Sequence, residues 1–216
     1  MSFDPVEDKI VPKWLSVIWL IIKIILGAAL ILMLGWFTLR SCYQAGTGKM
    51  KAYMWTEAAV SASEKGELTV KRLNEYQDPS LSSLFFISRI YHTEEIGQLQ
   101  FMLRYNTLSQ EYKDMLDENG EAEFVFELTD KNGTHFTRYS YITDSALMYN
   151  YFRVAFEDVR VDLYDMLYVN IYLVTDEGDT QVGSCIVYDR EGGAQDHKVK
   201  GKAEVPAGLM HGEKVE

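Results

Sequence analysis

The sequence predicts a mainly β protein in which a single N-terminal transmembrane helix precedes an antiparallel β-sandwich with one or two short helices. Three observations predict this class. Residues 14–39 form an almost continuous apolar run. From Leu84 onward, short aromatic and β-branched runs alternate in polarity, as half-buried strands do. Turn-forming residues rather than helical crossovers separate these runs, which favours antiparallel pairing.

Composition divides the 216 residues into five segments. With 47% hydrophobic and 25% charged residues, the chain has enough apolar material for one core. The last segment contains five basic residues, five acidic residues and five glycines, which predicts disorder. The expected order is a short N-terminal tail (1–13), the transmembrane helix (14–39), a partly helical juxtamembrane stalk (40–66), the β-sandwich (67–189) and a disordered tail (190–216).

The apolar run is long enough to cross a bilayer. Its 26 residues would extend roughly 39 Å as a helix, more than the ~30 Å of hydrocarbon in a membrane. Trp14 and Trp19 lie toward one end and Trp36 toward the other, where interfacial rings are expected. Lys23 is charged, and we expect its amine to snorkel to the N-terminal interface. The alternative is an ion pair with an acidic residue of a partner helix.

Several features bear on processing and orientation. No A-x-A-like site follows the run, so cleavage as a signal peptide is the minority interpretation. Leu39-Arg40-Ser41-Cys42 is similar to a lipoprotein box, from which Arg40 departs. Basic residues on the two sides balance, but the part after Leu39 carries the whole net charge of -11. An acidic domain is the easier part to place outside, so we expect a single-pass protein of the cell membrane with a cytoplasmic N-terminus and an extracytoplasmic C-terminal domain.

The elements after the membrane segment follow from periodicity. Lys49–Lys65 predicts a stalk helix, because Met50, Met54 and Ala58 recur every four residues, and Leu108–Leu116 predicts a second helix. Strict alternation predicts strands, the first with Leu99, Phe101, Leu103 and Tyr105 on one face and Gln98, Gln100, Met102 and Arg104 on the other. Asp130–Gly133 is a turn that makes the strands on either side of it a hairpin. The predicted strands are 97–106, 124–128, 134–142, 151–156, 167–174 and 180–188.

Recognisable catalytic motifs are lacking. The charge of -11 and a pI of about 4.9 argue against nucleic acid as a partner, since that affinity comes from neutralising phosphates. The four histidines and two cysteines are scattered, unlike zinc ligands, and no phosphate loop or Ser-His arrangement is persuasive. His92 and His135 fall in strand-like runs and His197 and His211 in the predicted tail, and each is expected to be a solvated or packed side chain. Cys42 and Cys185 are expected to be independent thiols. Because no catalytic motif is found, the sequence predicts a non-enzyme.

Acidic loops are the one candidate metal constellation. Carboxylates from neighbouring loops can supply the six to eight oxygens that Ca²⁺ requires. Five acids crowd residues 114–123, where the EF-hand pattern fails at Met115. A second group, Asp176, Glu177 and Asp179, lies in a predicted turn and forms the candidate calcium site. Solvated loops of an acidic protein are the alternative.

Part of the chain resembles a known group of proteins. The stretches Gly97–Phe101 with Arg104–Asn106, Phe124–Asp130, Tyr149–Tyr151 and Val169–Val174 look like an uncharacterised family of single-pass membrane proteins of Gram-positive gut bacteria. The resemblance covers residues 84–189 and implies no activity and no site residue. The first strand is also similar to the opening strand of C2 domains, although the calcium loops of that family have no matching positions here. The expected sandwich is therefore immunoglobulin-like or C2-like.

These observations favour a membrane-anchored, non-catalytic interaction or ligand-binding module at the cell surface, with an unknown protein or surface ligand as partner. One alternative is a C2-like module that binds lipid with calcium. A second is an accessory subunit of a membrane complex, and a hydrolase is a third.

Overall fold

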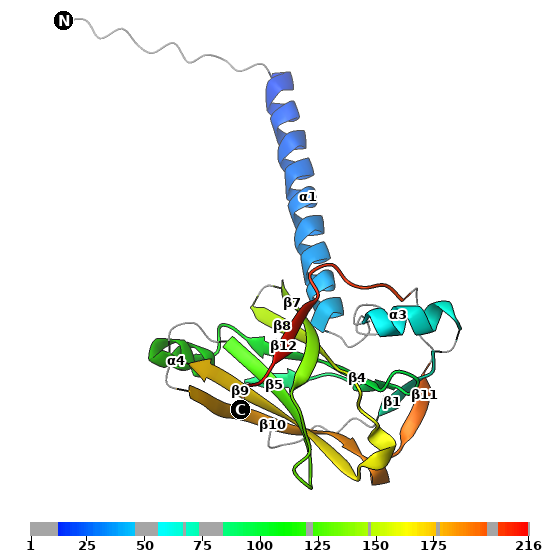
Figure 1. Cartoon of the computed structure of the whole chain (residues 1–216). Coiled ribbons are helices and arrows are strands. Elements are labelled where there is room, and N and C mark those ends of the chain that lie inside the picture. The colour runs from blue at the N-terminus through cyan, green and yellow to red at the C-terminus, as the bar shows by residue number, and fades with distance from the viewer. Residues whose placement is uncertain are drawn as a thin grey trace, which may run out of the picture. The chain divides into compact units, whose positions relative to one another are not determined.

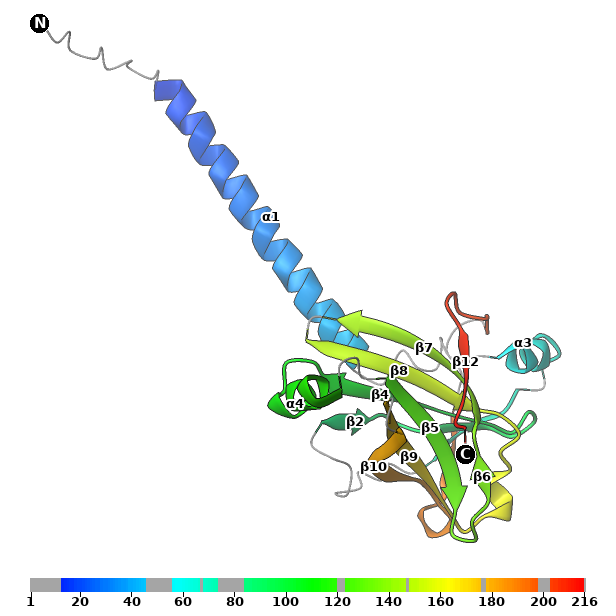
Figure 2. The ribbon, with the colours of Figure 1, turned by 60° about the vertical axis from the view of Figure 1, so that its left-hand side comes forward.

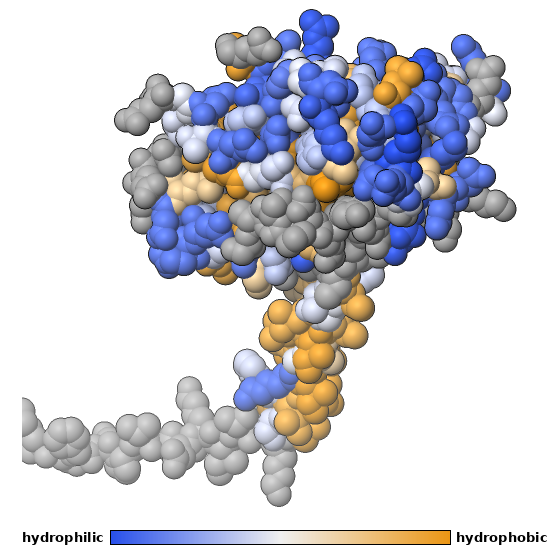
Figure 3. Space-filling view, turned by 90° about the horizontal axis from the view of Figure 1, so that it is seen from below, coloured by the Kyte–Doolittle hydropathy of each residue, from blue (hydrophilic) through white to orange (hydrophobic). Residues whose placement is uncertain are grey.

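The computed structural model describes residues 13–45, 56–66, 68–73, 84–119, 123–146, 148–175, 178–197 and 203–215. The chain divides into two compact units, Met1–Cys42 and Tyr43–Glu216. Helix α1 (Lys13–Ala45) makes up the described part of the first unit and continues just past its boundary (Figure 1). Residues Trp14–Arg40 of α1, whose most apolar stretch of 18 residues has a mean hydropathy of 2.8, form a helix long and apolar enough to span a membrane (Figure 3).

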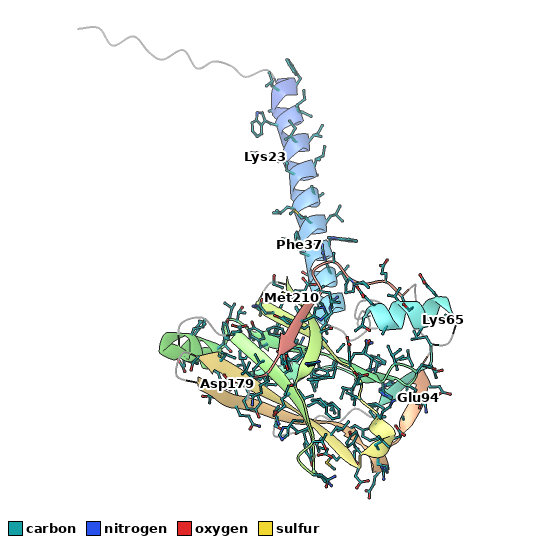
Figure 4. All side chains as sticks on the ribbon, viewed as in Figure 1. Lys23, Phe37, Lys65, Glu94, Asp179 and Met210 are labelled. Carbon is teal, nitrogen blue, oxygen red and sulfur yellow. The ribbon has the colours of Figure 1, made fainter. Side chains whose placement is uncertain are left out.

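Two polar side chains of α1, those of Lys23 and Thr38, have partners within the helix. The Lys23 ammonium lies 5.7 Å from the ring centroid of Trp19, one turn nearer the N-terminus (Figure 4). The Thr38 hydroxyl donates a hydrogen bond of 2.8 Å to the Leu34 carbonyl. The lysine is thus directed toward the N-terminal end of the helix, the geometry that snorkelling requires.

The second unit is a β-sandwich in which every described strand pair is antiparallel (Figures 1 and 2). The mainly β fold with antiparallel sheets and short helices is therefore confirmed. The large sheet has the order β11 (Ala194–His197), β1 (Val70–Leu73), β3 (Tyr91–Thr93), β4 (Gln98–Asn106), β8 (Tyr149–Phe156), β7 (Arg138–Ala146) and β12 (Met210–Glu213), with β2 (Phe85–Ile87) beside β4. The small sheet has the order β10 (Gly178–Asp189), β9 (Met166–Thr175), β5 (Glu123–Asp130) and β6 (His135–Phe136).

Aromatic rings fill the space between the sheets. Alternation along β5 turns Phe124 and Phe126 toward the large sheet, where Phe126 meets Phe152 edge-on with centroids 5.3 Å apart. Phe124 meets Tyr105 in the same way at 5.2 Å. Inward residues of β9 complete this core: Leu167, Val169, Ile171 and Leu173. The alternation predicted for these strands is confirmed.

The expected hairpin after β5 forms only in part. The Asp130 carboxylate accepts hydrogen bonds from the backbone N–H groups of Asn132 (2.8 Å) and Thr134 (2.7 Å), which fixes the turn. Of the predicted hairpin strand, only β6 pairs with β5. The chain then crosses to the large sheet, where β7 pairs with β8. The prediction that residues 134–142 are one hairpin strand is therefore wrong beyond Phe136.

The outer face of the large sheet is covered rather than solvated. Gln98 and Gln100 are buried, although their alternation with apolar residues suggests an exposed face. Helix α3 (Glu57–Glu64) begins at Thr56, whose hydroxyl donates to the Gln98 side-chain oxygen at 2.8 Å. Its buried residues are Ala59 and Ala62, whereas Ala58 is exposed, and Met50 and Met54 lie outside the described residues. The predicted stripe therefore does not set the packing face of α3.

The C-terminal segment is structured where it is described. A 3-10 turn η3 (Arg190–Gly192) leads into β11, and β12 ends the large sheet on its opposite edge. The prediction of a disordered tail at 190–216 is therefore wrong for these residues. Edge strands are held by backbone hydrogen bonds, which a glycine-rich, charged composition does not reveal. The other elements are α4 (Gln110–Asn119), which confirms the second predicted helix with a small shift, and η2 (Val161–Leu163).

Candidate functional site

A groove with a volume of about 580 Å³ lies beside the last strand of the large sheet. This volume falls within the ~300–1,000 Å³ typical of ligand sites. The groove is formed where β12 lies along β7, close to β5 of the small sheet (Figure 2). We call it the β7–β12 groove, and its lining consists of His135, Phe136, Thr137, Arg138, Tyr139, Ser140, Glu157, Asp158, His211, Gly212 and Glu213.

Ser140 links two ionisable residues on one wall of the groove. Its hydroxyl oxygen lies 3.3 Å from a Glu157 carboxylate oxygen and 3.0 Å from Nδ1 of His211. A hydroxyl has one proton, and the carboxylate can only accept, so the hydroxyl donates to Glu157. The contact between Ser140 and Nδ1 of His211 joins β7 to β12 on this wall.

This arrangement differs from a nucleophilic triad. In a triad the histidine accepts the serine proton and the acid orients the histidine. Here the acid, Glu157, contacts Ser140 rather than His211. Ser140 is also only 2% exposed. The geometry suits a fixed hydrogen-bonding surface better than attack on a substrate.

A second histidine borders the groove from the small sheet. Nδ1 of His135 lies 2.9 Å from the Glu127 carboxylate, which also accepts hydrogen bonds from Tyr172 (2.9 Å) and Asn170 (3.4 Å). Burial alone would raise the pKa of Glu127, but these hydrogen bonds outweigh it and hold the pKa below its usual value. The carboxylate of Glu127 thus holds the His135 ring in place through Nδ1.

The corner that carries Glu157 and Asp158 is rigidly held. Asp158 adopts a positive φ of 60°, a conformation that aspartate tolerates better than most residues. The next residue, Val159, donates its N–H to the Gly97 carbonyl at 2.7 Å and accepts from Nε2 of His92 at 2.9 Å. A β-carbon on Gly97 would lie 3.2 Å from the Val159 backbone, so this close approach favours glycine.

His92 is buried behind this corner. Desolvation lowers the pKa of His92, and the hydrogen bond to the Val159 carbonyl opposes that shift without cancelling it. The imidazole is therefore a neutral donor that braces the corner from inside the sandwich. Of the two expectations for this histidine, solvated or packed, the structure shows the packed one, in β3.

Side-chain contacts supplement the backbone pairing of β12. The ring of Tyr139 packs against Gly212, and Arg138 faces Glu213 across an exposed ion pair of 3.6 Å. Just past the strand, the Lys214 ammonium lies 3.6 Å from the ring centroid of Tyr172. These contacts keep one wall of the groove in place.

Of the three candidate calcium residues, only Asp179 lies in the part of the chain that the structure describes. Asp179 is an exposed residue of β10, while Asp176 and Glu177 lie outside the described residues. The described histidines, cysteines and acids form no group of three or more that could hold a metal ion. In Figure 4, Asp179 and Met210, the first residue of β12, are well separated. The predicted calcium site therefore gains no support.

The groove itself escaped the sequence analysis. Ser140 and His211 are 71 positions apart, and His211 falls in a segment that was predicted to be disordered. Cys185 is buried in β10 and is not among the residues that line the groove. No pattern local to His211 or Glu157 would have connected them.

Comparison with known proteins adds no relative. No family model, no curated protein and no solved structure matches this chain. The function is therefore argued from the geometry of the groove and the character of α1.

Proposed function

We propose that the chain is a membrane-anchored, non-catalytic binding module that presents the β7–β12 groove to a protein or ligand at the cell surface. In this proposal α1 lies in the bilayer with its N-terminus in the cytoplasm. The groove is the observation that carries the proposal, because it combines a ligand-sized volume with polar groups whose orientation is fixed.

The polar groups favour binding over turnover. The Nδ1 atoms of His135 and His211 are engaged by Glu127 and Ser140, so neither ring is free to change its hydrogen-bonding role easily. A binding site benefits from such preorganisation, because fewer side chains must be ordered when the ligand arrives. A serine nucleophile, by contrast, would have to be accessible and oriented by the acceptor nitrogen of a histidine.

Orientation can be tested on intact cells. A tag after Glu216 should be removed by external protease in intact cells, as expected for a domain outside the membrane. Protection of the tag until lysis would place the domain in the cytoplasm and contradict the surface role. An alkaline wash of the membranes should leave the full-length chain in the pellet.

Binding at the groove can be tested by photo-crosslinking in living cells. A photoreactive residue in place of Arg138, whose side chain is 87% exposed at the groove, should give a discrete adduct. The matched control replaces Thr180, an exposed residue of β10 outside the groove lining, and should give none. The proposal fails if Arg138 gives no adduct or if both positions give the same adducts.

A further inference from the structure

We infer that the β7–β12 groove takes an extended basic segment of a partner protein, with lysine or arginine side chains directed at Glu157 and Asp158. The inference rests on the proposed function, because it names the chemistry of the ligand for that same groove. Charge, hydrogen-bonding capacity and shape each support it.

The charge of the lining is negative. It contains three carboxylates, on Glu157, Asp158 and Glu213, and one guanidinium, on Arg138. Arg138 already faces Glu213 at 3.6 Å, which leaves the charges of Glu157 and Asp158 without a cation among the lining residues. The chain as a whole carries -11, so its field also attracts basic partners from a distance.

The exposed carboxylates of the lining are hydrogen-bond acceptors. Glu157 and Asp158 both line the groove and are exposed, and the Ser140 hydroxyl contacts one carboxylate oxygen of Glu157. Carboxylate oxygens accept hydrogen bonds and have none to donate. A ligand that satisfies them must therefore donate hydrogen bonds, as ammonium and guanidinium groups do.

The shape favours an extended chain. Every residue from His135 to Ser140 lines the groove, and such a run in strand-like conformation covers roughly 16 Å. His211, Gly212 and Glu213 of β12 line the groove beside β7, the strand with which they pair. The groove thus follows a run of consecutive extended residues, which suits an extended segment better than a compact ligand.

The test uses the full-length protein in detergent micelles and two labelled peptides of equal length. One alternates arginine with alanine, the other glutamate with alanine, and binding is followed by fluorescence anisotropy at fixed ionic strength. We expect the basic peptide to bind and the acidic peptide not to bind. Glu157→Gln with Asp158→Asn should weaken the basic peptide about tenfold or more, equivalent to about 1.4 kcal/mol. Asparagine suits position 158 because it also tolerates positive φ.

The control variant carries Asp179→Asn and Glu191→Gln, which remove the same charge from exposed positions outside the groove lining. Its affinity should stay within about twofold of the parent, since distant surface charges contribute little at moderate salt. Equal weakening by both variants would show general electrostatic attraction and overturn the inference. The inference would also be overturned if the acidic peptide bound or if neither peptide bound. Spermidine that displaced the basic peptide at the same concentration would overturn it as well, because no extended peptide would then be required. A specific adduct at Arg138 in cells would still uphold the proposed function in those cases.

Discussion

The ring of Tyr139 occupies the space that a side chain at Gly212 would need. A β-carbon at Gly212 would lie 2.5 Å from two carbons of that ring. The ring cannot easily retreat, because its hydroxyl accepts a hydrogen bond from the Phe126 backbone at 3.3 Å and its face packs on Phe156 with centroids 5.5 Å apart. Tyr139 thus connects β12, the large sheet and the small sheet at one point.

Gly212→Ala should therefore destabilise the sandwich. We expect a loss of about 1–3 kcal/mol in the free energy of unfolding, the usual cost of an overpacked site. Chemical denaturation of the full-length protein, followed by circular dichroism, measures the loss. Met210→Ala, on the same strand but exposed, should change stability by less than about 0.5 kcal/mol. Equal stability of Gly212→Ala and the parent would mean that β12 does not pack as described.

Glu127→Gln should destabilise the protein at neutral pH but not at low pH. The folded protein holds the pKa of Glu127 below its unfolded value, so the ionised carboxylate stabilises the fold above the unfolded pKa of about 4.3. This contribution is lost as the pH falls through the folded pKa. We expect a difference of about 1.5–3 kcal/mol at pH 7, as for hydrogen bonds to a charged group, and its disappearance in acid. Glu123→Gln, an exposed change on the same strand, is the control and should show no such pH-dependent difference.

His92 should make the stability fall as the pH drops below neutrality. Burial lowers the pKa of His92 from its ordinary value of 6.5, so the unfolded chain takes up a proton before the folded chain does. The loss begins as the pH falls through 6.5 and continues down to the folded pKa. His92→Gln can still donate to the Val159 carbonyl but does not titrate. For His92→Gln, the free energies of unfolding at pH 7 and pH 5 should lie closer together than they do for the parent. A pH dependence equal to that of the parent would refute the assignment.

Lys23→Leu should leave the membrane association of the chain unchanged. The ammonium near Trp19 is directed toward the N-terminal end of α1, so no partner acid is needed to hold it. Lys23→Asp should reduce insertion, because a short carboxylate cannot reach the interface in the same way. Alkaline extraction of membranes with quantitative blotting measures both. Loss of the Leu variant from the pellet would favour the alternative ion pair with a partner helix.

The strands with strict alternation were predictable because one face of each is apolar. The strand around Phe101 and that around Val169 appear in the structure within one or two residues of their predicted ends. The burial of Gln98 and Gln100 was not predictable, since it depends on α3 lying against that face. A polar strand face is solvated by default and gives no sign of a later cover.

The groove was unpredictable for a related reason. It depends on β12 pairing with β7, which brings His211 beside Ser140 through backbone hydrogen bonds that any sequence can make. The composition of the last 27 residues predicts disorder, although their described part supplies both edges of the large sheet. Glu157 and Asp158 in turn depend on the contact between Gly97 and Val159, which is also distant in sequence.

The placement of β11 and β12 has a consequence for biosynthesis. Both edge strands of the large sheet come from residues 194–213, where β11 covers the outer edge of β1 and β12 covers the outer edge of β7. A chain in which these residues have not yet been synthesised therefore has β1 and β7 as its sheet edges. Exposed strand edges invite pairing with other chains, so forms that lack residues 194–213 present inner strands to such pairing. The edges of the folded sheet are thus determined only after the inner strands have been made.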